Sequence, residues 1–131
     1  MLDIDGFRQI NDRFGHAGGD RVLVEVARVL RAHLRRSDRV GRFGSDEFMV
    51  LLPGLALDRT QAMAARLAQA LAKLSVPGVP TTLSARFGVV GVGDGESITD
   101  AFRRADARLL AAGATTLQPP QRPFPGHGSI A

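Results

Sequence analysis

Residues 39–52 read RVGRFGSDEFMVLL, and this stretch decides the fold. Two mainly apolar segments, RVGRF and FMVLL, flank Gly44 and Ser45, which is typical of two antiparallel strands joined by a tight turn. Two acids, Asp46 and Glu47, follow the turn directly. The stretch therefore predicts a β-hairpin with carboxylates beside its turn.

Outward from the hairpin, strand and helix patterns alternate along the chain. The segment MLDID at residues 1–5 has the pattern of a strand that ends in acids. Apolar residues at spacings of three and four predict helices on both sides of the hairpin. The predicted elements are strand 1–5, helix 19–36, strands 39–43 and 48–52, helix 58–74, strand 82–90 and helix 98–112.

The helix predictions depend on start signals and on apolar stripes. A glycine-rich turn, FGHAGGD at residues 14–20, precedes the first helix. Asp58 with Gln61 and Ser97 with Asp100 have the spacing of capping boxes at the starts of the second and third helices. The residues predicted to face the core are Leu23, Val26, Ala27, Leu30 and Leu34, then Met63, Leu67, Ala70, Leu71 and Leu74, then Ile98, Ala101, Phe102, Ala105 and Leu109.

The order of these elements is β-α-β-β-α-β-α, and its first six match the split βαβ, or ferredoxin-like, pattern. The sequence therefore predicts an α+β domain with an antiparallel-type central sheet and helices packed on one face of it. In this topology the first and third strands are central neighbours that run antiparallel. Asp3 and Asp5 should therefore lie near Asp46 and Glu47.

Composition limits the class of protein. The chain of 131 residues is about one domain long, and no apolar run approaches the roughly 20 residues that cross a bilayer. Acids near the N-terminus do not suit a signal peptide, so a cytoplasmic location is the default expectation. The chain has no cysteine, which excludes disulfides and thiolate chemistry. A net charge of +4 suggests an anionic partner, which can be a nucleotide, a nucleic acid or an acidic surface, although a general preference for arginine explains the charge equally well.

The predicted acidic cluster points to metal chemistry. Carboxylates confined together must take up protons or hold a cation. Mg²⁺ suits such a place when phosphates bind nearby, because it takes a few carboxylates and completes its shell with substrate oxygens and water. Two such ions can activate a hydroxyl and neutralise charge at phosphorus. From the spacing alone, acids that simply face water at strand ends explain the pattern equally well.

Three segments carry a resemblance to a known family. LDIDGFRQINDRFGHAGGD at residues 2–20, RFGSDEF at 42–48 and LLPG at 51–54 closely resemble the GGDEF domain of diguanylate cyclases. The resemblance covers about residues 1–110. We therefore interpret residues 1–113 as a partial GGDEF-like nucleotidyl cyclase domain. The Pro- and Gly-rich residues 114–131 are predicted to be a disordered tail.

The resemblance implies a palm-type sheet on which two GTP molecules are condensed to cyclic di-GMP at a homodimer interface. It also implies Mg²⁺ or Mn²⁺ as cofactor, two ions per GTP site. Asp3 and Asp46 look like the metal ligands, helped by the Ile4 carbonyl. Glu47 looks like the adjacent acid that supports the metals or the activation of the 3′-hydroxyl. Asp3, Asp46 and Glu47 are thus the implied catalytic residues.

The resemblance also implies substrate and product contacts. Guanine contacts fall on Asn11 and Asp20, although without the motif a turn residue and a helix cap explain these two residues as well. The remaining implied substrate contacts are Phe7, Arg8, Gly44 and Ser45. An inhibitory product site, which binds cyclic di-GMP, is implied at Arg35, Asp38 and Arg66.

The sequence also departs from the family pattern. Ser45 stands where glycine is usual, and Gly113, also the predicted stop of the third helix, and Leu117 stand where basic residues contact phosphates. The family's D-x-L-T-G-L-x-N-R segment does not precede Met1, so we expect either that the numbered start is not the natural one or that the domain is truncated. The alternative function is a degenerate domain that binds cyclic di-GMP or GTP as a regulatory module. RNA binding is disfavoured because base-stacking aromatic residues are not interleaved with the basic ones.

Overall fold

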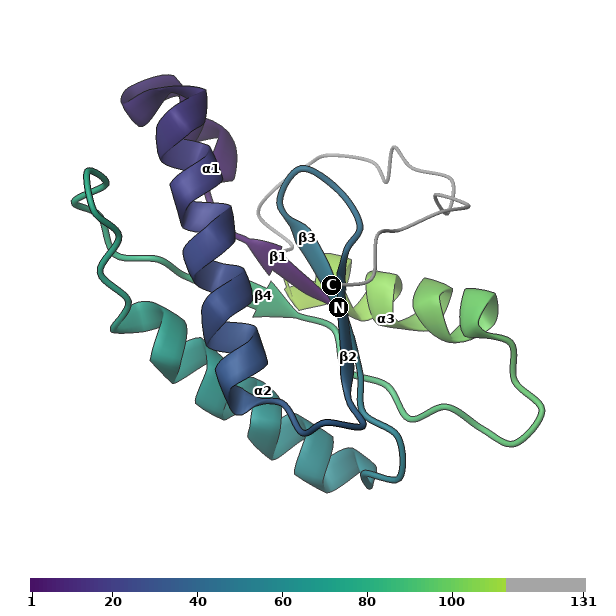
Figure 1. Cartoon of the computed structure of the whole chain (residues 1–131). Helices are drawn as coiled ribbons and strands as arrows, with labels where there is room; N and C mark the ends of the chain where they lie inside the picture. Colours follow the sequence, from purple (N-terminus) through teal and green to yellow (C-terminus); the bar gives the residue numbers. More distant parts are fainter. Residues whose placement is uncertain (113–131) are drawn as a thin grey trace.

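The computed structural model describes residues 1–112 (Figure 1). Gly113, Leu117 and the tail 114–131 lie outside the described residues. No helix in the described part is long and apolar enough to cross a membrane. The elements are β1 (Leu2–Ile4), α1 (Phe7–His33), β2 (Arg39–Arg42), β3 (Glu47–Leu51), α2 (Leu57–Ala72), β4 (Ala85–Phe87) and α3 (Ile98–Ala112), which confirms the predicted order and the α+β class.

The strands of residues 1–112 form an antiparallel sheet in the order β2-β3-β1-β4. β1 pairs with β3 so that Leu2 lies opposite Phe48 and Asp3 opposite Glu47. On its other side, β1 pairs with β4, and Asp3 lies opposite Arg86. β2 and β3 form the predicted hairpin. The prediction that the first and third strands are central antiparallel neighbours is confirmed.

Two strands are shorter than predicted. β1 and β4 have three residues each, instead of the predicted five and nine. The reason lies in the register, in which Leu2–Ile4 lie opposite Ala85–Phe87. A residue counts as strand only where it has a ladder partner, so the short β1 also limits the length of β4.

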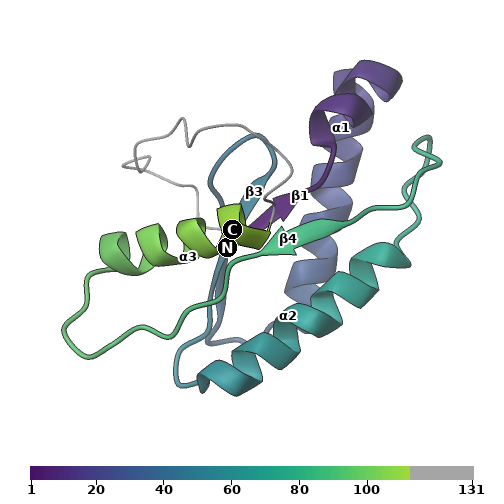
Figure 2. The same ribbon diagram turned by 180° about the vertical axis from the view of Figure 1, so that it is seen from behind.

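Helices cover both faces of the sheet. α1 and α2 pack against one face, whereas α3 lies on the opposite side (Figures 1 and 2). Leu2 and Ile4, which alternate with Asp3 along β1, belong to the core shared with α1 and α2. The ring of Phe102 on α3 lies 5.8 Å from the ring of Phe43. The prediction that the helices share one face therefore holds for α1 and α2 only. On the other side, α3 packs against apolar residues that include Phe43.

Most residues of the predicted helix stripes are buried. Each leucine that leaves water contributes roughly 1.5–3 kcal/mol to folding, so these stripes hold the helices on the sheet. Ile98 differs from the prediction, because 45% of it is exposed at the first turn of α3. The buried stripe residues are Leu23, Val26, Leu30, Met63, Leu67, Leu71, Ala101, Ala105 and Leu109.

The first helix begins earlier than predicted. α1 starts at Phe7 rather than at residue 19, and it contains a kink at Gly15, whose φ of 74° and ψ of 171° are not helical. The kink divides α1 into a first arm before Gly15 and a second arm after it. Gly18, in the second arm, lies so close to the first that a Cβ on it would be 2.6 Å from the Cβ of Phe14. The glycines allow the two arms to pack closely. The segment that we predicted as a turn is therefore mostly helical.

One of the two predicted capping boxes is present. The Ser97 hydroxyl accepts a hydrogen bond of 3.1 Å from the Asp100 backbone N–H and donates one of 2.9 Å to the Asp100 carboxylate. The Asp58 prediction is wrong, because α2 begins one residue earlier and its N-cap, Ala56, has no side-chain cap bond. Asp58 lies instead in the first turn of α2, where its negative charge interacts favourably with the positive end of the helix dipole.

Candidate functional site

The ends of β1 and β3 bring carboxylates together. The sheet register puts Asp3 opposite Glu47, and the Ile4 backbone N–H donates a 3.0 Å hydrogen bond to the Asp46 carbonyl. Asp46 also lies close enough to raise the pKa of Asp3 through its charge. The structure thus places Asp3, Ile4, Asp46 and Glu47 in one region.

Asp3 has an unusual environment for an acid. Its side chain is only 14% exposed. Burial and then the charge of Asp46 raise its pKa from 3.8 to about 7, although the positive charge of Arg86 opposes the rise. Its Oδ2 accepts a 2.8 Å hydrogen bond from Nη2 of Arg86, whereas its Oδ1 is buried and has no hydrogen-bond partner among the described residues. An unpartnered buried carboxylate oxygen is costly unless a cation or proton joins it.

Asp5 makes its polar contacts with residues at the start of β4. Its carboxylate accepts hydrogen bonds of 2.8 Å from the Ser84 hydroxyl and 3.0 Å from Nε of Arg86. Its backbone N–H also donates to the Ser84 carbonyl at 2.9 Å. These contacts hold Asp5 beside β4, because the chain leaves β1 at this point and turns into α1.

The acids at the ends of β1 and β3 suit a divalent cation that already has water or phosphate oxygens among its ligands. Within residues 1–112, no group of three or more acidic, histidine or cysteine side chains is gathered tightly enough to hold a metal by itself. The available donors are carboxylate oxygens, including the unpartnered Oδ1 of Asp3. Mg²⁺ and Mn²⁺ accept such hard oxygen donors, and Mg²⁺ keeps waters and substrate phosphates as further ligands. The donor set therefore suits a metal–phosphate complex better than a bare ion.

The kink in α1 brings the predicted guanine-binding residues near each other. A Cβ on Gly19 would overlap the side-chain oxygen of Asn11 and would lie 3.2 Å from Cζ of Phe7. Asn11, on the first arm, therefore lies against the start of the second arm, where Asp20 is exposed. The missing side chain of Gly19 makes this approach possible. No pattern in the sequence indicates this role.

The N-terminus of α1 presents backbone donors. Its N-cap, Gly6, has a left-handed φ of 64°, and the first intrahelical bond runs from the Ile10 N–H to the Gly6 carbonyl at 3.1 Å. The N–H groups before Ile10 have no intrahelical acceptor, which makes a helix start suitable for anions. The Phe7 side chain is buried and Arg8 is exposed. Of these two residues, only Arg8 can offer its side chain to a ligand, whereas Phe7 can offer its backbone.

The hairpin turn accommodates serine without backbone strain. No residue other than glycine has a positive φ in residues 1–112, so Ser45 lies in an ordinary region of backbone conformation. Gly44 has no positive φ either, and its carbonyl accepts a 2.8 Å hydrogen bond from Nε of Arg42. The Ser45 hydroxyl lies 3.4 Å from Oδ1 of Asp46. Glycine is therefore not required at position 45 by the turn itself.

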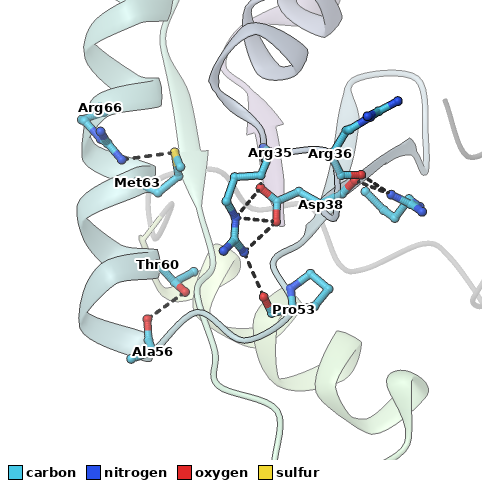
Figure 3. Close-up of polar contacts among 9 residues, drawn as sticks. Arg35, Arg36, Asp38, Pro53, Ala56, Thr60, Met63 and Arg66 are labelled. Atoms are coloured by element: carbon cyan, nitrogen blue, oxygen red, sulfur yellow. Dashed lines mark hydrogen bonds and ion pairs between the residues drawn. The ribbon is translucent and has the colours of Figure 1, made fainter.

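Arg35 and Asp38 form a tightly bonded pair after α1 (Figure 3). Asp38 has no exposed side-chain area, and its carboxylate accepts a 2.7 Å bond from the Arg35 backbone N–H and a 2.9 Å bond from Nη2 of the same residue. Burial alone would raise the pKa of Asp38, but the bonds and charge of Arg35 lower it below the usual value. Nη2 of Arg35 also donates to the Pro53 carbonyl at 2.9 Å. Arg66 is exposed on the neighbouring α2 and contacts Met63.

The described residues also form an apolar groove away from the acids. This groove of about 380 Å³ lies between α2, α3 and the ends of β3 and β4, and Met63, Leu67, Phe87 and Phe102 are among its lining residues. None of the acids at the ends of β1 and β3 lines it. The acidic region is therefore separate from this groove.

Comparisons with known proteins agree with this geometry. The family model "Diguanylate cyclase, GGDEF domain" matches residues 1–117. Diguanylate cyclase DgcP of Pseudomonas aeruginosa is 40% identical over 114 residues, which cover 86% of this chain and 17% of that protein. The chain therefore spans about a sixth of the length of this relative.

Two solved structures have the same fold. Diguanylate cyclase SiaD of Pseudomonas aeruginosa, in complex with its activator SiaC, superimposes with a TM-score of 0.80 at 39% identity, covering 87% of this chain and 45% of that one. The GGDEF domain of DgcB from Caulobacter crescentus, in complex with c-di-GMP, also gives 0.80, at 27% identity over 87% of this chain and 70% of that one. The chain belongs to the diguanylate cyclase GGDEF domain family.

Proposed function

We propose that this chain is the catalytic domain of a diguanylate cyclase that condenses two GTP molecules to cyclic di-GMP. Each 3′-hydroxyl attacks the α-phosphorus of the other GTP, the bond to the β-phosphate breaks, and pyrophosphate leaves. The observation that carries the proposal is the buried, unpartnered Oδ1 of Asp3 beside the hairpin acids. Together with the family relationship, this oxygen supports a cation site for phosphate chemistry in this chain.

The side chains have separate tasks in the proposed reaction. Asp3, Asp46 and the Ile4 carbonyl hold divalent ions, and Glu47 supports them or the 3′-hydroxyl. When bound, Mg²⁺ or Mn²⁺ lowers the pKa of the attacking hydroxyl and neutralises charge on the phosphates. The two GTP molecules are presented by two protomers of a homodimer. A monomer thus holds only half of the reacting atoms.

Binding of the nucleotide uses both arms of α1. Asp20 accepts hydrogen bonds from the guanine N1–H and N2–H groups, and the Asn11 amide pairs with the ring acceptors. The backbone N–H groups of Phe7 and Arg8, together with the Arg8 side chain, face the triphosphate. Gly44 and Ser45 border the nucleotide at the hairpin. Adenine offers a different edge to Asp20, so ATP should be a poor substrate.

The test is product formation by the purified chain. Incubation with GTP and Mg²⁺ should yield cyclic di-GMP and two pyrophosphates per product, at a rate that rises faster than linearly with protein concentration. Asp46→Asn should reduce the rate by at least about 100-fold, because a charged ligand is lost. Asp94→Asn, in an exposed loop, is the matched control. Absence of cyclic di-GMP at high protein concentration would overturn the proposal.

A second candidate function is the binding of cyclic di-GMP at Arg35, Asp38 and Arg66. The buried Asp38 carboxylate fixes Arg35, whose side chain remains 50% exposed, so its guanidinium is held in one orientation at the surface. A fixed guanidinium suits guanine and phosphate acceptors. Calorimetry with cyclic di-GMP should show binding that Arg35→Ala removes and Asp46→Asn preserves. Equal binding by both variants would place the ligand elsewhere.

A further inference from the structure

Arg86 links Asp3 of β1 to Asp5, which follows the last residue of β1. It lies on β4 directly opposite Asp3. Its Nη2 donates a 2.8 Å hydrogen bond to Oδ2 of Asp3, and its Nε donates a 3.0 Å bond to Oδ1 of Asp5. Only 23% of the Arg86 side chain is exposed. One guanidinium thus spans both carboxylates.

The strand register produces this arrangement. Residues directly opposite in an antiparallel pair have their side chains on the same face, so Arg86 shares a face with Asp3. Asp5 follows two residues after Asp3, just beyond the end of β1, and comes within reach of the same guanidinium. Arg86 has several N–H donors in one rigid plane, so it can hold two carboxylates at once, whereas a lysine cannot reproduce that geometry.

The contacts of Asp3 are divided between its two oxygens. Arg86 takes Oδ2, while Oδ1 has no partner within residues 1–112. A hydrogen bond to one oxygen fixes the rotation of the carboxyl group and therefore the direction of the other oxygen. Metal-ligating carboxylates are commonly held in this way, and loss of the supporting contact weakens metal binding.

We propose that Arg86 is a positioning residue for the divalent-cation site, which fixes Asp3 through Oδ2 so that Oδ1 is available to the cation. This inference rests on the metal site of the proposed function. The guanidinium also offsets part of the repulsion of Asp3 by Asp46 and Glu47 before a cation arrives. Arg86 does not bind the cation or the substrate in this role.

The test is Mn²⁺ binding by the full 131-residue chain in the presence of a GTP analogue that does not react at its α-phosphate, followed by the electron paramagnetic resonance signal of free Mn²⁺ against the same analogue without protein. Arg86→Ala should weaken Mn²⁺ binding by about 10–100-fold. Arg86→Lys keeps the charge without the fork and should recover only part of the loss. Ser84→Ala is the matched control, because it removes a hydrogen bond of Asp5 without touching Asp3, and it should stay within about twofold.

The outcomes separate this inference from the proposed function. Unchanged or tighter Mn²⁺ binding by Arg86→Ala would overturn the inference, since a guanidinium that competes with the cation gives that result. Circular dichroism checks folding, and Arg86→Gln, which retains much of the side-chain stem, serves if the alanine variant does not fold. If wild type binds Mn²⁺ and Arg86→Ala weakens it, but no cyclic di-GMP forms, the inference stands and the proposed function fails. A wild-type chain that binds no Mn²⁺ overturns both.

Discussion

Replacing Asp3 by asparagine should stabilise the metal-free protein increasingly as the pH rises from 5 to 8. Burial and the charge of Asp46 raise the pKa of Asp3 from 3.8 to about 7. The folded state therefore binds this proton more tightly than the unfolded state does. The wild-type protein loses stability as the pH rises from about 4 to about 7, and the full cost is present above pH 7. The asparagine variant has no charge at this position and avoids this loss.

The magnitude follows from the shift. About three pKa units correspond to roughly 4 kcal/mol at 1.36 kcal/mol per unit, of which roughly 2.7 kcal/mol develops above pH 5. Solvent screening of the partly exposed site reduces this to about 1–2 kcal/mol. The hydrogen bond from Arg86 is largely retained, because the asparagine oxygen also accepts.

Urea unfolding in EDTA at pH 5, 6, 7 and 8 measures the effect. The difference in unfolding free energy between Asp3→Asn and wild type should grow by about 1–2 kcal/mol across this range. Asp94→Asn, which is exposed, should show no such growth. A constant difference for Asp3→Asn from pH 5 to 8 would refute the reasoning, because Asp3 would then titrate outside this range. Titrations that the two proteins share cancel in the difference.

Three further predictions concern folding. Gly19→Ala should lower the free energy of unfolding by about 1–3 kcal/mol, because the added Cβ overlaps the Asn11 side chain. In a double-mutant cycle, adding Asn11→Ala should recover most of this loss, and additive effects of the two substitutions would contradict the contact. Asp38→Ala should lower the unfolding free energy by about 2–3 kcal/mol, since it leaves the Arg35 backbone and side-chain donors without their acceptor. A loss below about 1 kcal/mol, measured by urea unfolding, would contradict this prediction. Ser45→Gly should destabilise by about 0.5–1 kcal/mol through unfolded-state entropy, and a gain in melting temperature would show that serine strains the turn.

The hairpin and the pairing of β1 with β3 could be predicted because they depend on local signals. A turn between two apolar segments sets the hairpin, and the β-α-β-β order then leaves few sheets that bury both strands. The approach of Asp3 to Asp46 and Glu47 followed from that order alone. These parts of the site follow from the topology, and the order of strand and helix patterns in the sequence predicts that topology.

Other parts depend on tertiary contacts that a pattern does not contain. Three glycines within residues 15–19 favour a turn by propensity, yet Gly18 and Gly19 are buried in a helix because the first arm packs over them. Arg86 lies between Ala85 and Phe87 in a short strand, so its role appears only when the register puts it opposite Asp3. A lone arginine in a strand is the one signal that the sequence offered.

The cost of the acidic region also bears on how the site works. Asp3, with a raised pKa and an unpartnered Oδ1, is unfavourable when ionised in the metal-free protein. Arg86 reduces this cost through Oδ2 but leaves the other oxygen without a partner. A cation that brings its own phosphate ligand satisfies Oδ1 and replaces the proton, so binding relieves a destabilisation built into the central strand. Metal–nucleotide binding and folding stability should therefore be linked most strongly above pH 7, where the proton no longer competes.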